Sequence, residues 1–201
     1  MTDDIFLLDT NVISNTIKTY PLPAVKRWLE NETRLALSFP VILEIETGIA
    51  DLRRVDPTRA RKLAEWVDGL LKTRFYYPPS SPEVARVLAR LYCCRPLERL
   101  WQPEEDKKPG QDLFIAAMSI VYDMPIATMN SGDFEQINKH RPLPGVFNPN
   151  RGIWTIPRLT KTAKDDPSAE VGARDEPPRL ASNQDQEQPN DWGALSRLSR
   201  W

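Results

Sequence analysis

An unbroken apolar run near the start of the chain, from Ile5 to Leu8, ends in the carboxylate of Asp9. A run of this kind, without alternating polar residues, is typical of a strand that is buried on both faces of a parallel sheet. Ligands of open parallel α/β sheets bind at the carboxyl ends of the strands, which is where Asp9 stands. Because an unpaired buried charge costs several kcal/mol, Asp9 needs a cation, hydrogen-bond donors or a proton.

Strand-like and helix-like segments alternate along residues 1–157, which is the pattern of an α/β domain. We predict strands at 5–9, 35–39, 75–77, 125–128 and 145–147. We predict helices at 11–18, 23–30, 41–52, 57–72, 81–94 and 111–122, and a loop at 95–110.

The composition changes after Pro157, where apolar residues become scarce. We therefore predict that residues 158–201 form a mostly disordered tail, because such a segment buries too little surface to offset its ordering entropy. The end of this tail carries apolar residues at every third position: Trp192, Leu195, Leu198 and Trp201. We favour an end without fixed structure, and the alternative is a short amphipathic helix that binds a partner.

The overall composition limits the classes of function. The 201 residues carry 27 Lys and Arg against 28 Asp and Glu, so nucleic-acid binding would depend on a local basic patch. His140 is the only histidine and the two cysteines are adjacent, which argues against zinc sites, Ser-His-Asp catalysis and a disulfide framework. Without a signal peptide or a membrane-spanning run, we expect a soluble cytoplasmic protein. Candidate residues for a basic patch are Arg53, Arg54, Arg59, Arg61, Lys62, Arg95, Arg99, Lys107 and Lys108.

Other acidic residues are candidates to join Asp9. Glu44 and Glu46 flank the apolar stripe of the predicted helix at 41–52, and periodicity does not choose between them. Asp112 is the lone charge of a predicted helix at 111–122 that is apolar nearly all round and therefore buried. Each of these acids also has a purely structural interpretation, as a helix cap or as a solvated helix flank.

The segment after the strand at 125–128 adds Asn130 and Asp133 at the sheet edge that Asp9 occupies, although both are also common turn residues. Carboxylates that meet at such an edge repel by about 4 kcal/mol at a separation of ~4 Å and an effective dielectric near ~20. One of them must bind a proton, or a divalent ion must neutralise them. Oxygen ligands without histidine or thiolate favour Mg²⁺ or Mn²⁺, whose bound water can attack a phosphodiester.

Four sequence blocks resemble those of the PIN-domain nucleases, in particular the VapC-type toxins of type II bacterial toxin–antitoxin pairs. The resemblance runs from Phe6 to about Asn148, and the blocks are Leu7 to Ser14, Ser38 with Glu44 to Ile49, Gln111 to Ala117, and Ile126 to Phe134. The resemblance implies a three-layer PIN fold for residues 1–157, with a central, mostly parallel sheet flanked by helices. It also implies an endoribonuclease that depends on Mg²⁺ or Mn²⁺.

The resemblance implies that Asp9, Glu44 and Asp112 are catalytic, and that Asp9 and Asp112 hold the metal. It selects Glu44 over the neighbouring acid at position 46. Asn130 stands where the family often has a fourth acid, so Asn130 and Asp133 are candidates for additional metal or water ligands.

The resemblance also implies partners. Members of this family commonly pair with a small antitoxin protein, and homodimers are common among them, so we expect an RNA substrate, a cognate antitoxin and a homodimer. One alternative is a PIN-like binding module that has lost catalysis. Another is an RNA-processing PIN nuclease that is not a toxin.

Overall fold

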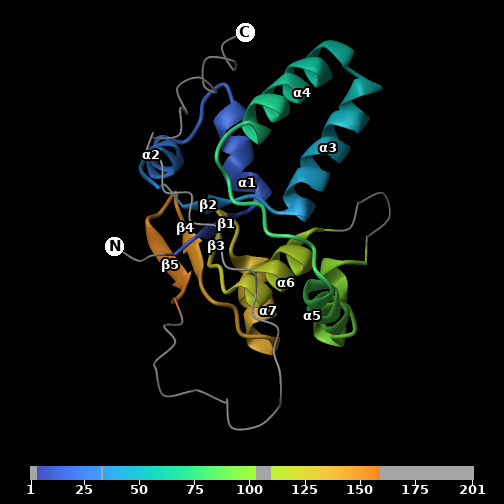
Figure 1. The fold of residues 1–201 in the computed structure, drawn as a ribbon, viewed down its shortest axis with the longest axis vertical. Coiled ribbons are helices and arrows are strands. Elements are labelled where there is room, and N and C mark those ends of the chain that lie inside the picture. The colour runs from blue at the N-terminus through green and yellow to red at the C-terminus, as the bar shows by residue number, and fades with distance from the viewer. Residues whose placement is uncertain (1–3, 33, 103–109, 159–201) are drawn as a thin grey trace.

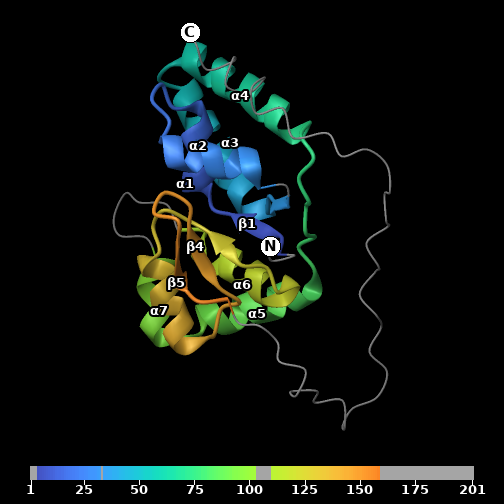
Figure 2. The same cartoon turned by 90° about the vertical axis from the view of Figure 1, so that its left-hand side faces the viewer.

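The computed structural model describes residues 4–32, 34–102 and 110–158. Its strands are β1 (Phe6–Leu8), β2 (Leu35–Ala36), β3 (Ile126–Ala127), β4 (Val146–Asn148) and β5 (Ile153–Ile156). Its helices are α1 (Thr10–Ile13), α2 (Pro23–Asn31), α3 (Phe39–Arg53), α4 (Pro57–Leu71), α5 (Pro82–Tyr92), α6 (Asp112–Tyr122) and α7 (Gly132–His140), with 3₁₀ helices η1 (Ser14–Ile17) and η2 (Arg95–Leu100). Figures 1 and 2 show α1 to α4 on one side of the sheet and α5 to α7 on the other. This arrangement confirms the predicted fold class.

The five strands form one sheet in the order β2-β1-β3-β4-β5. The first four strands of this order run parallel, and β5 runs antiparallel to β4. Leu7 pairs with Ile126, which pairs with Val146, and all three side chains are fully buried. The unbroken apolar run of β1 is thus explained by burial on both faces, as predicted. Because β1 and β3 are parallel neighbours, Asp9 and Thr128, which directly follow them, meet at one edge of the sheet.

Two elements were not predicted. Helix α7 begins within Ser131-Gly132-Asp133, a run of turn-forming residues, but it buries Phe134 and Ile137 three positions apart. Strand β5 lies at the sheet edge, where Ile153 is 47% exposed. The predicted strand at 75–77 is reduced to a single bridge between Ala36 and Tyr76, because that segment passes β2 only briefly. The predicted loop at 95–110 contains η2, and its residues 103–109 lie outside the described part of the chain.

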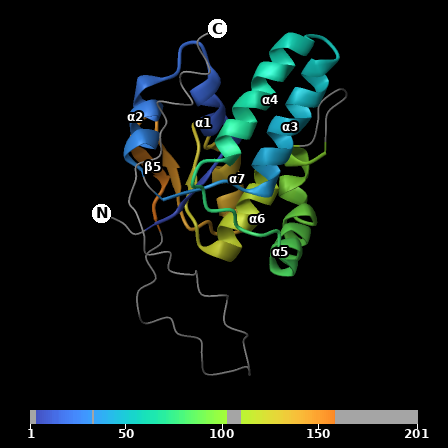
Figure 3. The ribbon, with the colours of Figure 1, turned by 45° about the horizontal axis from the view of Figure 1, so that its top comes forward.

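Helices α3 and α4 form an antiparallel hairpin that projects away from the sheet (Figures 1 and 3). The connection is short, and the carboxylate of Asp56 accepts a hydrogen bond from the backbone N–H of Arg59 at 2.9 Å, which caps α4. Ala60, Trp66 and Val67 are buried on the inner side of α4. In the described residues no helix is both long and apolar enough to cross a membrane.

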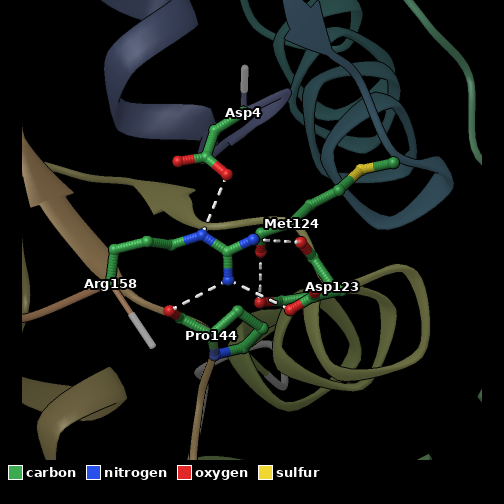
Figure 4. Close-up of polar contacts among 6 residues, drawn as sticks. Asp4, Asp123, Met124, Pro144 and Arg158 are labelled. Carbon is green, nitrogen blue, oxygen red and sulfur yellow. Dashed lines mark hydrogen bonds and ion pairs between the residues drawn. The ribbon is translucent and has the colours of Figure 1, made fainter. Parts of the chain in front are cut away.

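The last described residue, Arg158, joins three separate segments (Figure 4). Its Nε donates to Asp4 at 2.9 Å, and its Nη1 donates to the Asp123 carboxylate at 3.0 Å and to the Pro144 carbonyl at 3.3 Å. Its Nη2 donates to the Asp123 carbonyl at 3.1 Å, where α6 ends in a left-handed residue. We call these four residues the Arg158 network. The rest of the predicted tail, including the Trp192–Trp201 end, lies outside the described residues.

Candidate functional site

Asp9 is held at the carboxyl edge of the sheet by contacts to both neighbouring segments. Its backbone N–H donates to the Ala127 carbonyl of β3 at 3.0 Å, and the residue is only 6% exposed. It precedes α1, yet its carboxylate makes no capping hydrogen bond there. Instead, Oδ2 accepts hydrogen bonds from Asn11 Nδ2 and Thr128 Oγ1, each at 2.6 Å. Asp9 is therefore oriented from both α1 and the end of β3.

The direction of the Thr128 hydrogen bonds follows from donor counting. Its Oγ1 accepts from Asn11 Nδ2 and from the backbone N–H of Asn130, both at 3.0 Å. Because a hydroxyl has one proton, that proton is available to Asp9, the nearer acceptor. Asn11 Oδ1 in turn accepts from the Met129 N–H at 3.0 Å. Sequence reasoning considered Asn11 only as a possible helix cap and placed neither Asn11 nor Thr128 in the site, because turn-forming residues after a strand give no sign of a contact across more than a hundred positions.

Glu44 lies on α3, one layer away from Asp9, and is exposed. Its Oε2 accepts a hydrogen bond of 2.7 Å from Thr10 Oγ1, so the residue next to Asp9 links the two acids. Its charge is one of those that raise the pKa of Asp9 and of Asp112, and that of Glu46 is not. Adding a side chain at Gly48, one turn further along α3, would meet nothing within 4 Å. The surface beside Glu44 is thus open.

Asp112 is the first residue of α6, whose side chains from Ile115 to Ser119 are all buried. Burial, and then the charges of Asp9, Asp133 and Glu44 in that order, together raise the pKa of Asp112 to about 7. Burial likewise raises the pKa of Asp9 to about 6, against the hydrogen bond from Thr128, which lowers it. The acids therefore share one electrostatic environment, although they come from β1, α3, α6 and α7.

The two remaining candidates differ in their relation to these acids. Asp133, in the first turn of α7, is close enough for its charge to act on Asp112. Asn130 joins the site through its backbone N–H, which donates to Thr128, while the residue itself is exposed.

The oxygen donors of these residues fit a hard divalent cation that keeps part of its water shell, and they do not form a site in which the protein supplies every ligand. Over the part of the chain that the structure describes, no group of three or more His, Cys, Asp or Glu residues is close enough to hold a metal ion. No described cation forms an ion pair with Asp9, Glu44 or Asp112 either. Mg²⁺ commonly binds through one or two carboxylates and keeps several waters, so a complete protein cage is not required. Oxygen donors with unbalanced negative charge suit such an ion.

Comparisons with known proteins bear on the family. The PIN domain family model matches residues 6–140, a span that contains every candidate site residue. Among solved structures, FitAcB from Neisseria gonorrhoeae is 24% identical with a TM-score of 0.53, covering 72% of this chain and 98% of that one. VapBC2 from Rickettsia felis, bound to a promoter DNA fragment, is 20% identical with a TM-score of 0.49, covering 66% and 92%. VapBC-5 from Mycobacterium tuberculosis is 20% identical with a TM-score of 0.45, covering 72% and 98%.

No curated protein matches the chain. The family match covers well over half of the 201 residues, and it confirms the family that the sequence blocks predicted. The chain belongs to the PIN domain family.

Proposed function

We propose that this protein is a metal-dependent endoribonuclease that hydrolyses RNA phosphodiester bonds and acts as the toxin of a type II toxin–antitoxin pair. The observation that supports the proposal is that the charge of Glu44 acts on both Asp9 and Asp112, that of Asp9 acts on Asp112, and the pKa values of Asp9 and Asp112 are raised. Carboxyl groups whose pKa is strongly raised by burial and by neighbouring charges are typical of functional sites. Charges that repel in the metal-free protein attract a divalent ion.

The residues divide the chemistry among them. Asp9 and Asp112 would hold Mg²⁺ or Mn²⁺, and the bound ion would activate water and neutralise charge on the phosphate. Glu44 is exposed beside them and would orient the attacking water and accept its proton. Thr128 keeps the Asp9 carboxylate in place through its hydroxyl. Asp133 and Asn130 would supply further contacts to metal-bound water.

The partner assignments rest on the sequence blocks that resemble VapC-type toxins and on family membership. A cognate antitoxin, an RNA substrate, a homodimer and a cytoplasmic location follow from that resemblance. Expression of the chain without its antitoxin should arrest growth, whereas an RNA-processing nuclease should be tolerated.

The decisive experiment is RNA cleavage by matched variants. Purified protein should cut RNA with Mg²⁺ or Mn²⁺ and should be inactive in EDTA. Asp9→Asn and Glu44→Gln should abolish cleavage, because the first removes a charge that would hold the metal and the second removes the group that would accept the proton of the attacking water. Glu46→Gln is the control, since it makes the same change on the same helix, away from the acids. Cleavage in EDTA, or equal activity of Glu44→Gln and Glu46→Gln, would contradict the assignment.

A catalytically weakened binding module is the second candidate, favoured by the neutral Asn130 where related proteins often have an acid. The two candidates differ in their response to metal. A ligand at ~100 times its dissociation constant stabilises a protein by about 2.7 kcal/mol. An active nuclease should therefore show a clear increase in Tm with millimolar Mg²⁺, and an inert module should show none.

A further inference from the structure

An excess of positive charge is concentrated in one short segment of the chain. Residues 53–62 contain five cations and one acid, a net charge of +4, whereas the whole chain has a net charge of −1. The remaining residues therefore carry −5. Such a local excess in a nearly neutral protein is a positive patch that can attract polyanions. The cations are Arg53, Arg54, Arg59, Arg61 and Lys62.

These residues occupy the free end of the α3–α4 hairpin, which we call the basic tip (Figures 1 and 3). All five cations are exposed. Arg61 lies 4.0 Å from Glu65, with both side chains more than half exposed, and the other four form no ion pair with a described residue. The only acid of the tip, Asp56, already accepts a backbone hydrogen bond as the cap of α4. The positive charge of the tip is thus directed to solvent.

Helix stability accounts for only part of these charges. Arg53, in the last turn of α3, is favoured by the macrodipole of that helix, whereas Arg59, in the first turn of α4, opposes the macrodipole of its own helix. Each unfavourable charge in such a position costs about 0.3–1 kcal/mol. Of the apolar side chains in the tip, Ala60 is buried on the inner side of α4 and Val55 is 85% exposed. A solvent-directed set of cations that largely lacks acidic partners indicates binding of an anionic partner.

We propose that the basic tip holds the phosphate backbone of RNA at a distance from the cleaved bond. This inference rests on the proposed nuclease function. Glu44 lies in the second turn of α3 and Arg53 is the last residue of that helix, and the nine residues from one to the other span about 14 Å along the helix axis. At ~3.4 Å of helix axis per phosphate of one strand, this distance corresponds to about four phosphates. A strand that passes Glu44 and follows α3 therefore reaches the tip.

The tip contains no aromatic side chain on which a base could stack. Contacts to phosphate position a nucleic acid without reading its sequence. The tip should therefore increase affinity for RNA of any sequence, leaving the choice of the cleaved bond to the surface around the acids.

The test measures RNA binding by the full chain in EDTA, where no cleavage occurs. The probe is a fluorescent single-stranded RNA of about 20 nucleotides, titrated at several salt concentrations. The tip variant combines Arg53→Gln, Arg54→Gln, Arg59→Gln and Lys62→Gln. The control variant removes the same charge from exposed cations on α2, on α5, and at and just after the end of α7: Arg27→Gln, Arg90→Gln, Lys139→Gln and Arg141→Gln. Both variants have the same net charge.

Loss of four phosphate contacts should reduce the slope of log K against log salt by ~3, because each contact to a single strand contributes about 0.7. At low salt, affinity should fall by one to two orders of magnitude for the tip variant and much less for the control. Equal affinity of the tip and control variants would overturn the inference. Unchanged RNA affinity together with lost binding to polyglutamate would also overturn it, in favour of an acidic protein partner.

Cleavage kinetics separate this inference from the nuclease proposal. With Mg²⁺ and a long RNA, the tip variant should raise KM and leave kcat unchanged, because the tip does not touch the reacting atoms. Cleavage with a KM independent of the tip would overturn the inference and leave the nuclease intact. RNA binding that depends on the tip, in a protein that never cleaves RNA, would support the inference and contradict the nuclease proposal.

Discussion

Replacing Asp112 by Asn should stabilise the metal-free protein at neutral and alkaline pH while abolishing metal-dependent cleavage. Burial, and then the charges of Asp9, Asp133 and Glu44, raises the pKa of Asp112 from 3.8 to about 7. Because one pKa unit is worth about 1.4 kcal/mol, folding disfavours the ionised carboxyl by about 4 kcal/mol. Asparagine keeps the shape of the side chain and stays neutral. Most of this cost should therefore disappear in the variant above pH 7.

The direction of the pH dependence follows from proton binding. The folded protein holds the Asp112 proton more tightly than the unfolded chain does, so stability falls as the pH rises from 3.8 toward 7. Below that range the carboxyl is protonated in both states, and wild type and Asp112→Asn should be equally stable. Between about pH 5 and pH 8 the wild type should lose about 3 kcal/mol more than the variant.

The assay is urea denaturation in EDTA at these two pH values, with Asp68→Asn, an exposed acid on α4, as the control. Excess Mg²⁺ at pH 8 should then stabilise the wild type, because the ion neutralises the charged Asp112 carboxylate. The stability of Asp112→Asn should not change, because that variant has no carboxylate at this position. A free-energy difference between wild type and Asp112→Asn that is the same at both pH values would refute the reasoning. So would a variant that is no more stable than wild type at pH 8.

Three other changes probe the scaffold. Thr128→Val removes the hydroxyl that donates to Asp9 and should weaken Mn²⁺ binding by about 10–100-fold, as measured by titration calorimetry, whereas Thr128→Ser should restore it. Arg158→Met leaves Asp4 without its ion pair. Because the side chains of Arg158 and Asp4 are only 17% and 13% exposed, the unpaired Asp4 should lower the unfolding free energy by about 3 kcal/mol in urea denaturation. A matched loss for the exposed Arg151→Gln would contradict that reasoning. Gly145→Ala places a methyl group 2.8 Å from a Trp154 ring carbon and 3.1 Å from the Cα atom of Arg158. This crowding should reduce the unfolding free energy by about 1–3 kcal/mol and lower Tm. An unchanged Tm would show that the strand moves to make room for the methyl group.

The sequence alone predicts those elements whose burial leaves a local pattern. Strand β1 is an unbroken apolar run because helices cover both faces of the sheet, and α6 is apolar nearly all round because it is buried in the layer beneath. Helix α7 is short, and it begins with residues that are equally common in turns, so periodicity did not distinguish the two. Strand β5 lies at the sheet edge with one residue nearly half exposed, and its pattern is correspondingly weak.

The candidate site is only partly predictable for the same reason. The rule that ligands bind at the carboxyl ends of parallel strands places Asp9 and the turn after β3 together without any structure. The choice between Glu44 and Glu46 depends on which one faces Thr10, and that contact joins residues 34 positions apart. The hydrogen bond from Thr128 to Asp9 spans 119 positions, and the ion pair from Arg158 to Asp4 spans 154. Local propensity carries no information about such contacts.

Strand β1 and helix α6 each have an acid at both ends, and a described cation neutralises the acids at only one end of the pair. Asp4 precedes β1 and Asp123 follows α6, and Arg158 binds both of these acids. At the opposite ends of the same two elements, Asp9 and Asp112 come together with no described cation between them. Helix α6 has 11 residues and spans about 16 Å, so the guanidinium is too distant to neutralise both pairs. The fold thus supplies its own cation at one end of the two elements and none among the described residues at the other, which is where the proposed function would place a divalent ion.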